Sequence, residues 1–219
     1  MRELSKQELL ELTSNHFSHI SPNDRDEMAI PSYIHRNPLI RWLMWKRYEH
    51  ISKLSNFTKN MNVLEFGCGI GIFLPELNRM CGKVYAIDIF PEYAKLLSVK
   101  LNLNINFIYN LSEIADNSMD LVIAADVFEH IDDLSDYLMK FSNKLKNDGR
   151  LIVSGPTENV LYKIGRIVAG FCNKGDYHHR NIDEIIKMIT EAGFSLINQR
   201  KLPFVIPPHL FKICEFRNA

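Results

Sequence analysis

The residues best suited to chemistry lie in a glycine-rich segment, Glu65–Gly71 (EFGCGIG), and at Asp88, further along the chain. Glycines at alternate positions let the backbone turn tightly, and a side chain in such a loop would block a ligand lying against it. The apolar run Val84–Ile87 places Asp88 at the carboxyl end of a predicted strand. A carboxylate there can accept hydrogen bonds from both hydroxyls of a ribose. The spacing therefore predicts a strand–loop–helix crossover that binds a nucleoside.

Two other interpretations of the glycine loop exist. A glycine-rich turn can be a tight connection with no ligand. A dinucleotide site, as in a nicotinamide-dependent dehydrogenase, needs its last glycine three residues after the second, and Ile72 stands at that position. The third glycine is Gly71 instead, and the acidic Glu65 precedes the loop. Both features disfavour a dinucleotide.

The pattern acidic-x-Gly-x-Gly-x-Gly resembles the first motif of the class I S-adenosylmethionine-dependent methyltransferases. The resemblance implies that S-adenosylmethionine is the cofactor and S-adenosylhomocysteine its product. An acidic residue near the loop suits the cationic sulfonium of this cofactor. Cys68 is interpreted as a small residue beside the ligand rather than a nucleophile, because no base is adjacent to it in sequence. The resemblance places the following loop residues at the cofactor: Glu65, Gly67, Cys68, Gly69 and Gly71.

The resemblance also implies contacts with the adenosine part of the cofactor. Asp88 would hold the ribose, and Ile89 would pack on the face of the adenine. Relatives usually have an aspartate at the end of the third strand, where it accepts from the adenine amino group. Asn110 stands there in this chain, and its amide oxygen can accept the same bond. The backbone N–H of Leu111 would reach a ring nitrogen.

The segment Ala124–His130 (AADVFEH) resembles the hydrophobic-Glu-His signature of the family. The resemblance places Ala125 and Asp126 near the methionine part of the cofactor. The carboxylate of Asp126 would accept from the α-amino group or lie near the sulfonium. His130 either faces the pocket as a catalytic group or is a satisfied residue at the start of a helix, and both interpretations stay open.

A second polar cluster, Gly175–Arg180 (GDYHHR), follows the fifth predicted strand. Relatives often have a histidine here, which implies that His178 or His179 takes a proton from a hydroxyl acceptor. Tyr177 would position that histidine, and Arg180 would bind an anionic group. The alternative is that all of them are exposed loop residues. A metal site is disfavoured, because adjacent side chains diverge and no third ligand has a recognisable spacing.

Short apolar runs alternate with helical stretches from Asn62 onward, which predicts an α/β fold with a parallel sheet. The resemblance implies a Rossmann-like methyltransferase fold: seven strands, mostly parallel, closed by a C-terminal antiparallel hairpin strand. The expected strands are Asn62–Phe66, Lys83–Asp88, Ile105–Tyr109, Leu121–Asp126, Arg150–Gly155, Phe194–Leu202 and Leu210–Phe216. The expected helices are Ile72–Met80, Pro91–Lys100, Leu134–Leu145 and one from Asn181 or Asp183 to near Ala192, with a turn at Asn147–Gly149.

Residues 1–60 are predicted to form an N-terminal helical cap of the same domain, and residues 61–219 the methyltransferase domain. The cap would contain helices at Lys6–Ser18 and Leu39–Asn56, joined by a loop at Ser21–Pro38. Trp42 and Trp45 lie mostly off the apolar stripe of the second helix. They either pack on the first helix, which is favoured, or form a surface for a lipophilic substrate or a membrane.

An insertion at 156–180 does not belong to the minimal fold. It would contain a helix of its own over 158–169. Because it emerges beside the carboxyl ends of the strands, we interpret it as a lid or acceptor-pocket element. The alternative is a surface insertion without ligand contact.

The charge of the chain limits its partners. The 26 basic and 26 acidic side chains of the 219 residues cancel, so nothing indicates a nucleic-acid substrate. The four cysteines form no Cys-x-x-Cys pair, and neither a signal peptide nor a spanning apolar run is present, which predicts a cytoplasmic protein. A small-molecule acceptor is the expected partner, while membrane or lipid contact and the oligomeric state stay open.

Methyl transfer from a sulfonium is an in-line displacement that needs alignment more than a nucleophile. The resemblance is strongest to quinone-biosynthesis and related small-molecule enzymes, and the tryptophans together with Leu202–Pro208 favour a lipophilic or glycolipid-type acceptor. Two alternatives remain. An aminopropyl transferase would need more acidic residues than Asp126 and Glu129, and a non-catalytic partner protein would bind cofactor without turnover.

Overall fold

The computed structural model describes residues 3–157, 180–203 and 209–218. Seven strands in this part form one sheet in the order β3-β2-β1-β4-β5-β7-β6, and β7 runs antiparallel to both of its neighbours. This confirms the predicted fold class. The strands are β1 Asn62–Phe66, β2 Lys83–Ile87, β3 Asn106–Phe107, β4 Met119–Ala125, β5 Leu145–Pro156, β6 Ser195–Leu202 and β7 Phe211–Arg217.

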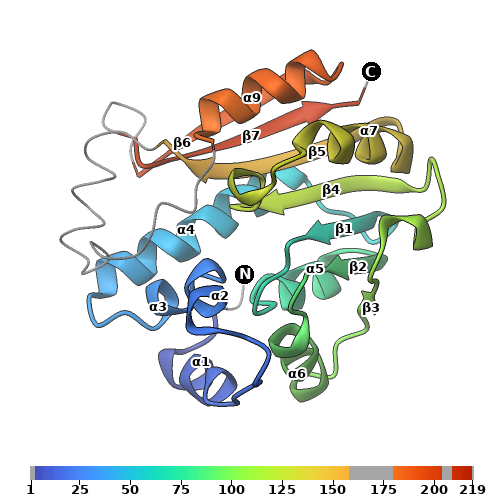
Figure 1. Cartoon of the computed structure of the whole chain (residues 1–219). Coiled ribbons are helices and arrows are strands. Elements are labelled where there is room, and N and C mark those ends of the chain that lie inside the picture. Colours follow the sequence, from blue (N-terminus) through green and yellow to red (C-terminus); the bar gives the residue numbers. More distant parts are fainter. Residues whose placement is uncertain (1–2, 158–179, 204–208, 219) are drawn as a thin grey trace.

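Helices cover both faces of the sheet (Figure 1). Helices α4, α5 and α6 lie on one face, and α7 and α9 lie on the other. The described helices are α1 Lys6–Thr13, α2 Pro22–Glu27, α3 Ile30–Tyr33, α4 Pro38–Ser55, α5 Leu74–Met80, α6 Glu92–Lys100, α7 Leu134–Lys144 and α9 Ile182–Glu191, with the 3-10 turns η1 Leu111–Glu113 and η2 Phe128–His130.

The core consists of two hydrophobic clusters separated by the sheet. Successive strand residues point to opposite faces, so Val63 and Leu121 join the cluster under α4 to α6, while Leu64 and Val122 join the one under α7 and α9. Both clusters are fully buried at these strands. The N-terminal helices share the first cluster, so they pack on the sheet as part of one hydrophobic core.

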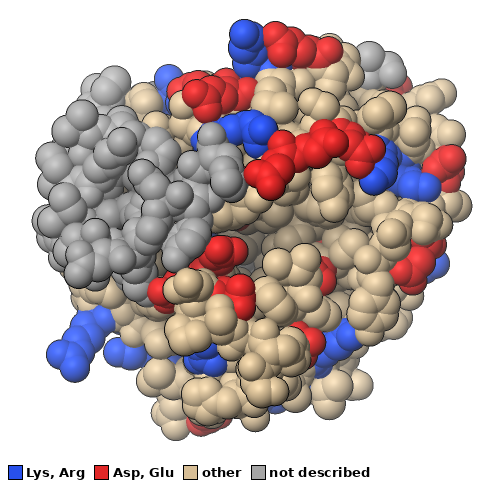
Figure 2. All heavy atoms as spheres, in the orientation of Figure 1, with Lys and Arg blue, Asp and Glu red and all other residues tan. Residues whose placement is uncertain are grey.

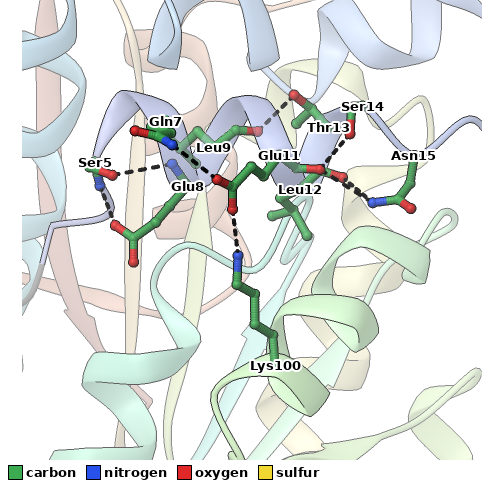
Figure 3. A network of polar contacts seen from close by, with 10 residues as sticks. All are labelled: Ser5, Gln7, Glu8, Leu9, Glu11, Leu12, Thr13, Ser14, Asn15 and Lys100. Atoms are coloured by element: carbon green, nitrogen blue, oxygen red, sulfur yellow. Dashed lines mark hydrogen bonds and ion pairs between the residues drawn. The ribbon is translucent and has the colours of Figure 1, made fainter.

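Helix α1 is shorter than predicted, because it ends at Thr13 rather than Ser18. Figure 3 shows the reason: the side chains of Thr13, Ser14 and Asn15 donate hydrogen bonds to carbonyl oxygens of the last turns. These short polar side chains compete with further helical bonds. The capping box predicted at the amino end is present at Ser5.

The cap is fastened to α6 by polar contacts. Lys100 of α6 donates to a carboxylate oxygen of Glu11 at 3.0 Å, as Figure 3 shows. Arg25 of α2 donates to the carbonyl oxygen of Thr13 at 2.7 Å, and its guanidinium also contacts the hydroxyl of Tyr93 in α6. These contacts hold α1 and α2 beside the edge of the sheet where β1 and β2 end.

The prediction of a loop at Ser21–Pro38 is wrong in part, because α2 and α3 lie within it. Ser21 and Asp24 form a capping box, and Pro22 occupies the first turn of α2, where its missing N–H costs nothing. Helices this short have no hydrophobic period, so their start signals were the only local evidence for them.

Two strands, β3 and β5, differ most from the prediction. β3 is reduced to Asn106–Phe107 instead of Ile105–Tyr109. The predicted turn Asn147–Gly149 lies inside β5, where the pairing with β4 shifts register. Asp148 has a φ angle of +61° there, which marks a bulge in the strand rather than a free turn.

The two tryptophans of α4 behave differently. Trp45 is buried, as the packing interpretation expects, but the ring 5.9 Å from its own is that of Tyr33 in α3, whereas the prediction named the first helix as its partner. Trp42 is 44% exposed, and the ammonium of Lys46 lies 5.9 Å from the centre of its ring. The predicted helix at 158–169 and nearly all of the insertion at 156–180 lie outside the described residues.

Candidate functional site

The candidate site lies where the parallel strands β1, β2 and β4 end. Their arrowheads point toward the side of the molecule on which the N-terminal helices lie (Figure 1). In the same orientation, Figure 2 shows a hollow at this place with acidic side chains along its upper rim. Ligands of open α/β sheets bind outside the carboxyl ends of the strands, so a ligand is expected here.

The glycine loop joins β1 to α5 and is fastened to the end of β2. The backbone N–H groups of Gly67 and Cys68 both donate to the carbonyl oxygen of Ile87, at 2.9 and 3.2 Å. Gly67, Gly69 and Gly71 have φ angles of +76°, +51° and +78°. This left-handed region is open to glycine without steric cost, so the alternating pattern produces a tightly wound loop.

The three glycines are required for different reasons, which corrects the expectation that each makes room for a ligand. A Cβ at Gly67 would overlap the methyl groups of Val127, and one at Gly71 would lie 2.8 Å from the Cα of Ala94. Both positions allow the loop to pack closely on protein. A Cβ at Gly69 would meet no heavy atom of the described residues within 4 Å. Gly69 therefore presents the open side of the loop.

Asp88 directly follows β2 and holds the glycine loop. Its carboxylate accepts from the backbone N–H of Gly69 at 2.6 Å and from that of Phe90 at 2.9 Å. Burial raises the pKa of Asp88, although these bonds favour its charged form. The next residue, Ile89, is 82% exposed. The ribose and adenine contacts stay predictions, and the geometry is compatible with both.

Glu65 lies in β1 and is buried beneath the loop. Its Oε2 atom has no hydrogen-bond partner among the described residues. Burial, and in second place the charge of Asp88, raises the pKa of Glu65 well above its usual value. A buried acceptor without a partner needs an explanation, and a cationic group bound nearby would provide one.

Asn110 and Leu111 lie at the start of η1. The Asn110 side chain is exposed, and its oxygen accepts from the backbone N–H of Ser112 at 2.9 Å, which leaves a second lone pair for the predicted adenine contact. Leu111 is buried. Beside them Lys95 of α6 donates to the hydroxyl of Tyr109 at 2.7 Å, a pair that was not predicted from the sequence. Nothing in the local spacing links these two residues.

Asp126 follows β4 with a φ angle of +57°, which is unusual for a residue with a side chain. Its carboxylate accepts from the hydroxyl of Ser154 at 2.8 Å and forms an ion pair with Arg47 of α4. Asp126 was predicted to contact the cofactor, whereas Arg47 was not among the predicted site residues. Ala125, next to it, is half-buried at the end of β4. The structure thus brings a basic residue of the cap to the predicted methionine end of the site.

The predicted catalytic residues are only partly described. His130 is half-buried at the end of η2. His178, His179 and Tyr177 lie outside the described residues, so their roles stay predictions. Arg180, proposed above for an anionic ligand, donates to the carbonyl oxygens of Ile131 and Asp132 and so fastens the chain after η2.

Cys68 is buried in the glycine loop. Burial raises the pKa of its thiol well above the usual value, and the carboxylates of Asp88 and Glu65 act in the same direction. A protonated thiol is a poor nucleophile. The structure therefore favours the interpretation of Cys68 as a small packing residue.

Within the described ranges, no group of three or more histidine, cysteine, aspartate or glutamate residues could hold a metal ion. The helices of these ranges include none that is both long enough and apolar enough to cross a membrane.

The sheet order, the glycine loop after β1 and the carboxylate after β2 together define a Rossmann-like methyltransferase fold. Comparison with protein families leads to the same class, because the profile of the family described as a methyltransferase domain matches residues 35–199. The chain belongs to this family. The predicted relationship to the class I S-adenosylmethionine-dependent methyltransferases is confirmed.

The sequence identity between this chain and its curated relatives is low. The chain is 28% identical over 155 residues to a ubiquinone biosynthesis O-methyltransferase of Bradyrhizobium diazoefficiens, covering 65% of this chain and 60% of the relative. It is 25% identical over 182 residues to the protein of the same name from Rickettsia canadensis, covering 76% of each. The chain thus spans about three fifths of the length of the first relative and three quarters of the second.

Among solved structures, the magnesium protoporphyrin IX methyltransferase of Synechocystis PCC 6803 with bound SAH superposes with a TM-score of 0.65. The alignment covers 89% of this chain and 94% of that one at 17% sequence identity. At this identity the likeness shows a shared fold. That fold binds the cofactor or its demethylated product, which agrees with the cofactor predicted from the glycine loop.

Proposed function

We propose that this chain transfers the methyl group of S-adenosylmethionine to a small, lipophilic acceptor. The observation that carries the proposal is the crevice at the ends of β1, β2 and β4. It combines a loop that is open at Gly69, the carboxylate of Asp88 beside it, and a buried unpaired oxygen of Glu65. A backbone cradle lined by carboxylates suits a nucleoside that carries positive charge and repels a pyrophosphate.

The residues of the chain would act mainly by alignment. When bound, the cofactor supplies an electrophilic methyl group on a sulfonium. Asp88 would accept the ribose hydroxyls, Ile89 would pack on the adenine, and Asp126 would hold the amino group. An acceptor fixed in line with the methyl group then needs no nucleophilic residue of the protein. This explains why a buried, protonated Cys68 is compatible with activity.

The acceptor atom that we propose is oxygen. Two relatives are named as O-methyltransferases of ubiquinone biosynthesis, and a hydroxyl acceptor loses a proton as it is methylated. A neutral histidine can take that proton. His130 is the last residue of η2, the turn that follows β4, and His178 and His179 are the other candidates.

The lipophilic character of the acceptor rests on α4. Leu39 and Trp42 expose 64% and 44% of their surface, three residues apart on one face of the helix. Exposed apolar side chains that are neighbours mark surfaces for apolar partners, so we include contact with a lipid or a membrane surface in the proposal. The reducing cytoplasm remains the proposed compartment, supported by free thiols at Cys68, Cys81 and Cys214.

Calorimetric titration with S-adenosylhomocysteine tests the cofactor, and a mass-spectrometric screen of phenolic and lipid acceptors for added methyl groups tests the reaction. We expect saturable binding and methylation of an apolar hydroxyl compound. A folded protein that binds neither S-adenosylmethionine nor its product would refute the proposal. Binding without turnover on any acceptor would point to the non-catalytic partner protein. Transfer of an aminopropyl group from decarboxylated S-adenosylmethionine would point to an aminopropyl transferase.

A further inference from the structure

Arg47 is the residue through which the N-terminal cap reaches the candidate site. It lies in α4 and is only 3% exposed. Its guanidinium pairs with the carboxylate of Asp126 and donates to the hydroxyl of Tyr33 at 3.0 Å. The ring of Phe211 lies 4.9 Å from its Cζ atom. Arg47 is thus held from several sides, and a group so constrained can hold its partner in one orientation.

Asp126 transmits this constraint to the glycine loop. Its backbone N–H donates to the carbonyl oxygen of Ser154 at 3.0 Å, and its carboxylate accepts from the Ser154 hydroxyl. The next residue, Val127, fills the space in which Gly67 would otherwise carry a Cβ. A continuous series of contacts therefore runs from α4 through Asp126 and Val127 to the loop that is expected to bind the cofactor.

One hydrogen-bonding group of Arg47 has no partner among the described residues. This group is its Nε atom, which is buried. The same holds for the Oε2 atom of Glu65. Both residues act electrostatically on the buried Tyr48, which follows Arg47 in α4. An unpaired donor and an unpaired acceptor in one buried region fit a ligand end that carries both charges, such as an amino acid.

We infer that Arg47 is a positioning residue of the methyl-transfer site: it orients the carboxylate of Asp126 toward the amino-acid end of the cofactor. This inference rests on the proposed function. It makes the cap part of the cofactor site, since the orienting group comes from α4 and the oriented one from the turn after β4. The adenosine end, held by Asp88, does not depend on Arg47.

Two ligands separate these ends. S-adenosylhomocysteine carries the amino-acid group, whereas 5′-methylthioadenosine lacks it. We expect Arg47→Met to lower the affinity for S-adenosylhomocysteine about 10- to 100-fold, as for the loss of charge-assisted hydrogen bonds, and to leave that for 5′-methylthioadenosine unchanged. Calorimetry measures both. Methionine keeps much of the apolar contact with Phe211, so the change removes mainly the charge.

Arg150 provides a matched control. It also links α4 to the sheet, because it donates to the carbonyl oxygens of Leu54 and Ser55 at 3.3 and 2.5 Å and pairs with the buried Glu215 at 2.6 Å. It pairs with Leu121 near the start of β4, whereas Asp126 follows the end of that strand. Arg150→Met should lower the melting temperature and leave the affinity ratio of the two ligands as in the wild type.

A double variant keeps the test valid if Arg47→Met folds poorly. Arg47→Met leaves the carboxylate of Asp126 without its cationic partner, and Arg47→Met/Asp126→Asn removes the charge of the carboxylate as well. We expect the double variant to regain the melting temperature but not the affinity for S-adenosylhomocysteine. Arg47→Lys, which keeps the charge but not the planar fork, should recover part of the affinity.

The outcomes separate the inference from the proposed function. Wild-type protein that binds neither ligand would refute the proposed function. Wild-type protein that binds both, with variants at Arg47 that bind S-adenosylhomocysteine normally or lose both ligands equally, would overturn the role of Arg47 alone. Recovery of affinity in the double variant would also overturn it, because it would show that Arg47 merely neutralises a buried charge.

Discussion

Substitution of single loop glycines by alanine tests where the ligand lies. Gly69→Ala adds a methyl group on the open side of the loop, with no described heavy atom within 4 Å. The φ angle of +51° costs alanine about 1 to 2 kcal/mol, because its Cβ crowds the following carbonyl in the left-handed region. In a chain of this size we expect the melting temperature to fall by about 2 to 8 °C.

The effect on binding should be much larger than the effect on folding. If the cofactor packs against the backbone at Gly69, the added methyl group occupies its place, and the affinity for S-adenosylhomocysteine should fall about 100-fold, or ~2.7 kcal/mol. Gly71→Ala should behave in the opposite way. Its Cβ would lie 2.8 and 2.9 Å from the Cα and Cβ of Ala94, so strain and overpacking add to a loss of about 2 to 5 kcal/mol of stability.

Gly193 supplies the control for backbone strain. It has a φ angle of +97°, a Cβ there would meet no described atom within 4 Å, and it follows α9, remote from the crevice. Gly193→Ala should cost stability like Gly69→Ala without a change in affinity. Thermal melts and calorimetry of the three variants provide both quantities. Wild-type affinity in Gly69→Ala would show that the open side of the loop is not where the ligand lies.

Three further predictions concern the side chains of the crevice. Asp88→Asn should weaken S-adenosylhomocysteine binding about 10- to 100-fold in calorimetry, because a neutral amide replaces the charged acceptor of the ribose; unchanged affinity would contradict the ribose contact. Cys68→Ala should retain methyl transfer in a turnover assay, and complete loss would make the thiol a nucleophile. For Glu65 the raised pKa means that its stabilising contribution is present below the usual value of 4.5 and is lost as the pH rises through the higher folded value. The melting temperature of Glu65→Gln minus that of the wild type should therefore increase between pH 4.5 and neutrality. A decrease in this difference over the same range would refute the stability effect assigned to Glu65.

The central sheet could be predicted because its signals are local. β1 runs over the predicted residues, Asn62–Phe66, since a short apolar run bounded by polar residues has few other solutions. The carboxyl end of α1 and the existence of α2 were harder to predict from the sequence. In α2 the capping box at Ser21 is the same signature that identified α1 at Ser5, but no apolar period follows it. A start signal without a period was not enough to predict a helix.

The candidate site likewise contains residues that local spacing predicts and residues that only tertiary packing brings together. Asp88 and the glycine loop follow from spacing within one crossover, because the loop and the strand end are neighbours by construction. Arg47 and Lys95 could not be found in this way. Their partners, Asp126 and Tyr109, belong to other elements, and only the packing of α4 and α6 on the sheet brings the pairs together. Local pattern thus identifies the groups predicted to bind, and tertiary packing decides which side chains pair with them.

Glu65 connects the stability of the chain to its proposed chemistry. Its raised pKa indicates that the carboxyl is hard to ionise in the folded protein, because burial and the charge of Asp88 both penalise the anion. A cation bound in the crevice favours the ionised form, so binding would draw a proton from Glu65. Affinity for a cationic cofactor would then rise with pH over the range in which Glu65 costs the fold stability. A buried carboxyl that weakens the free protein and strengthens the complex is what a binding role predicts, whereas a purely structural role would leave Glu65 better replaced by an apolar residue.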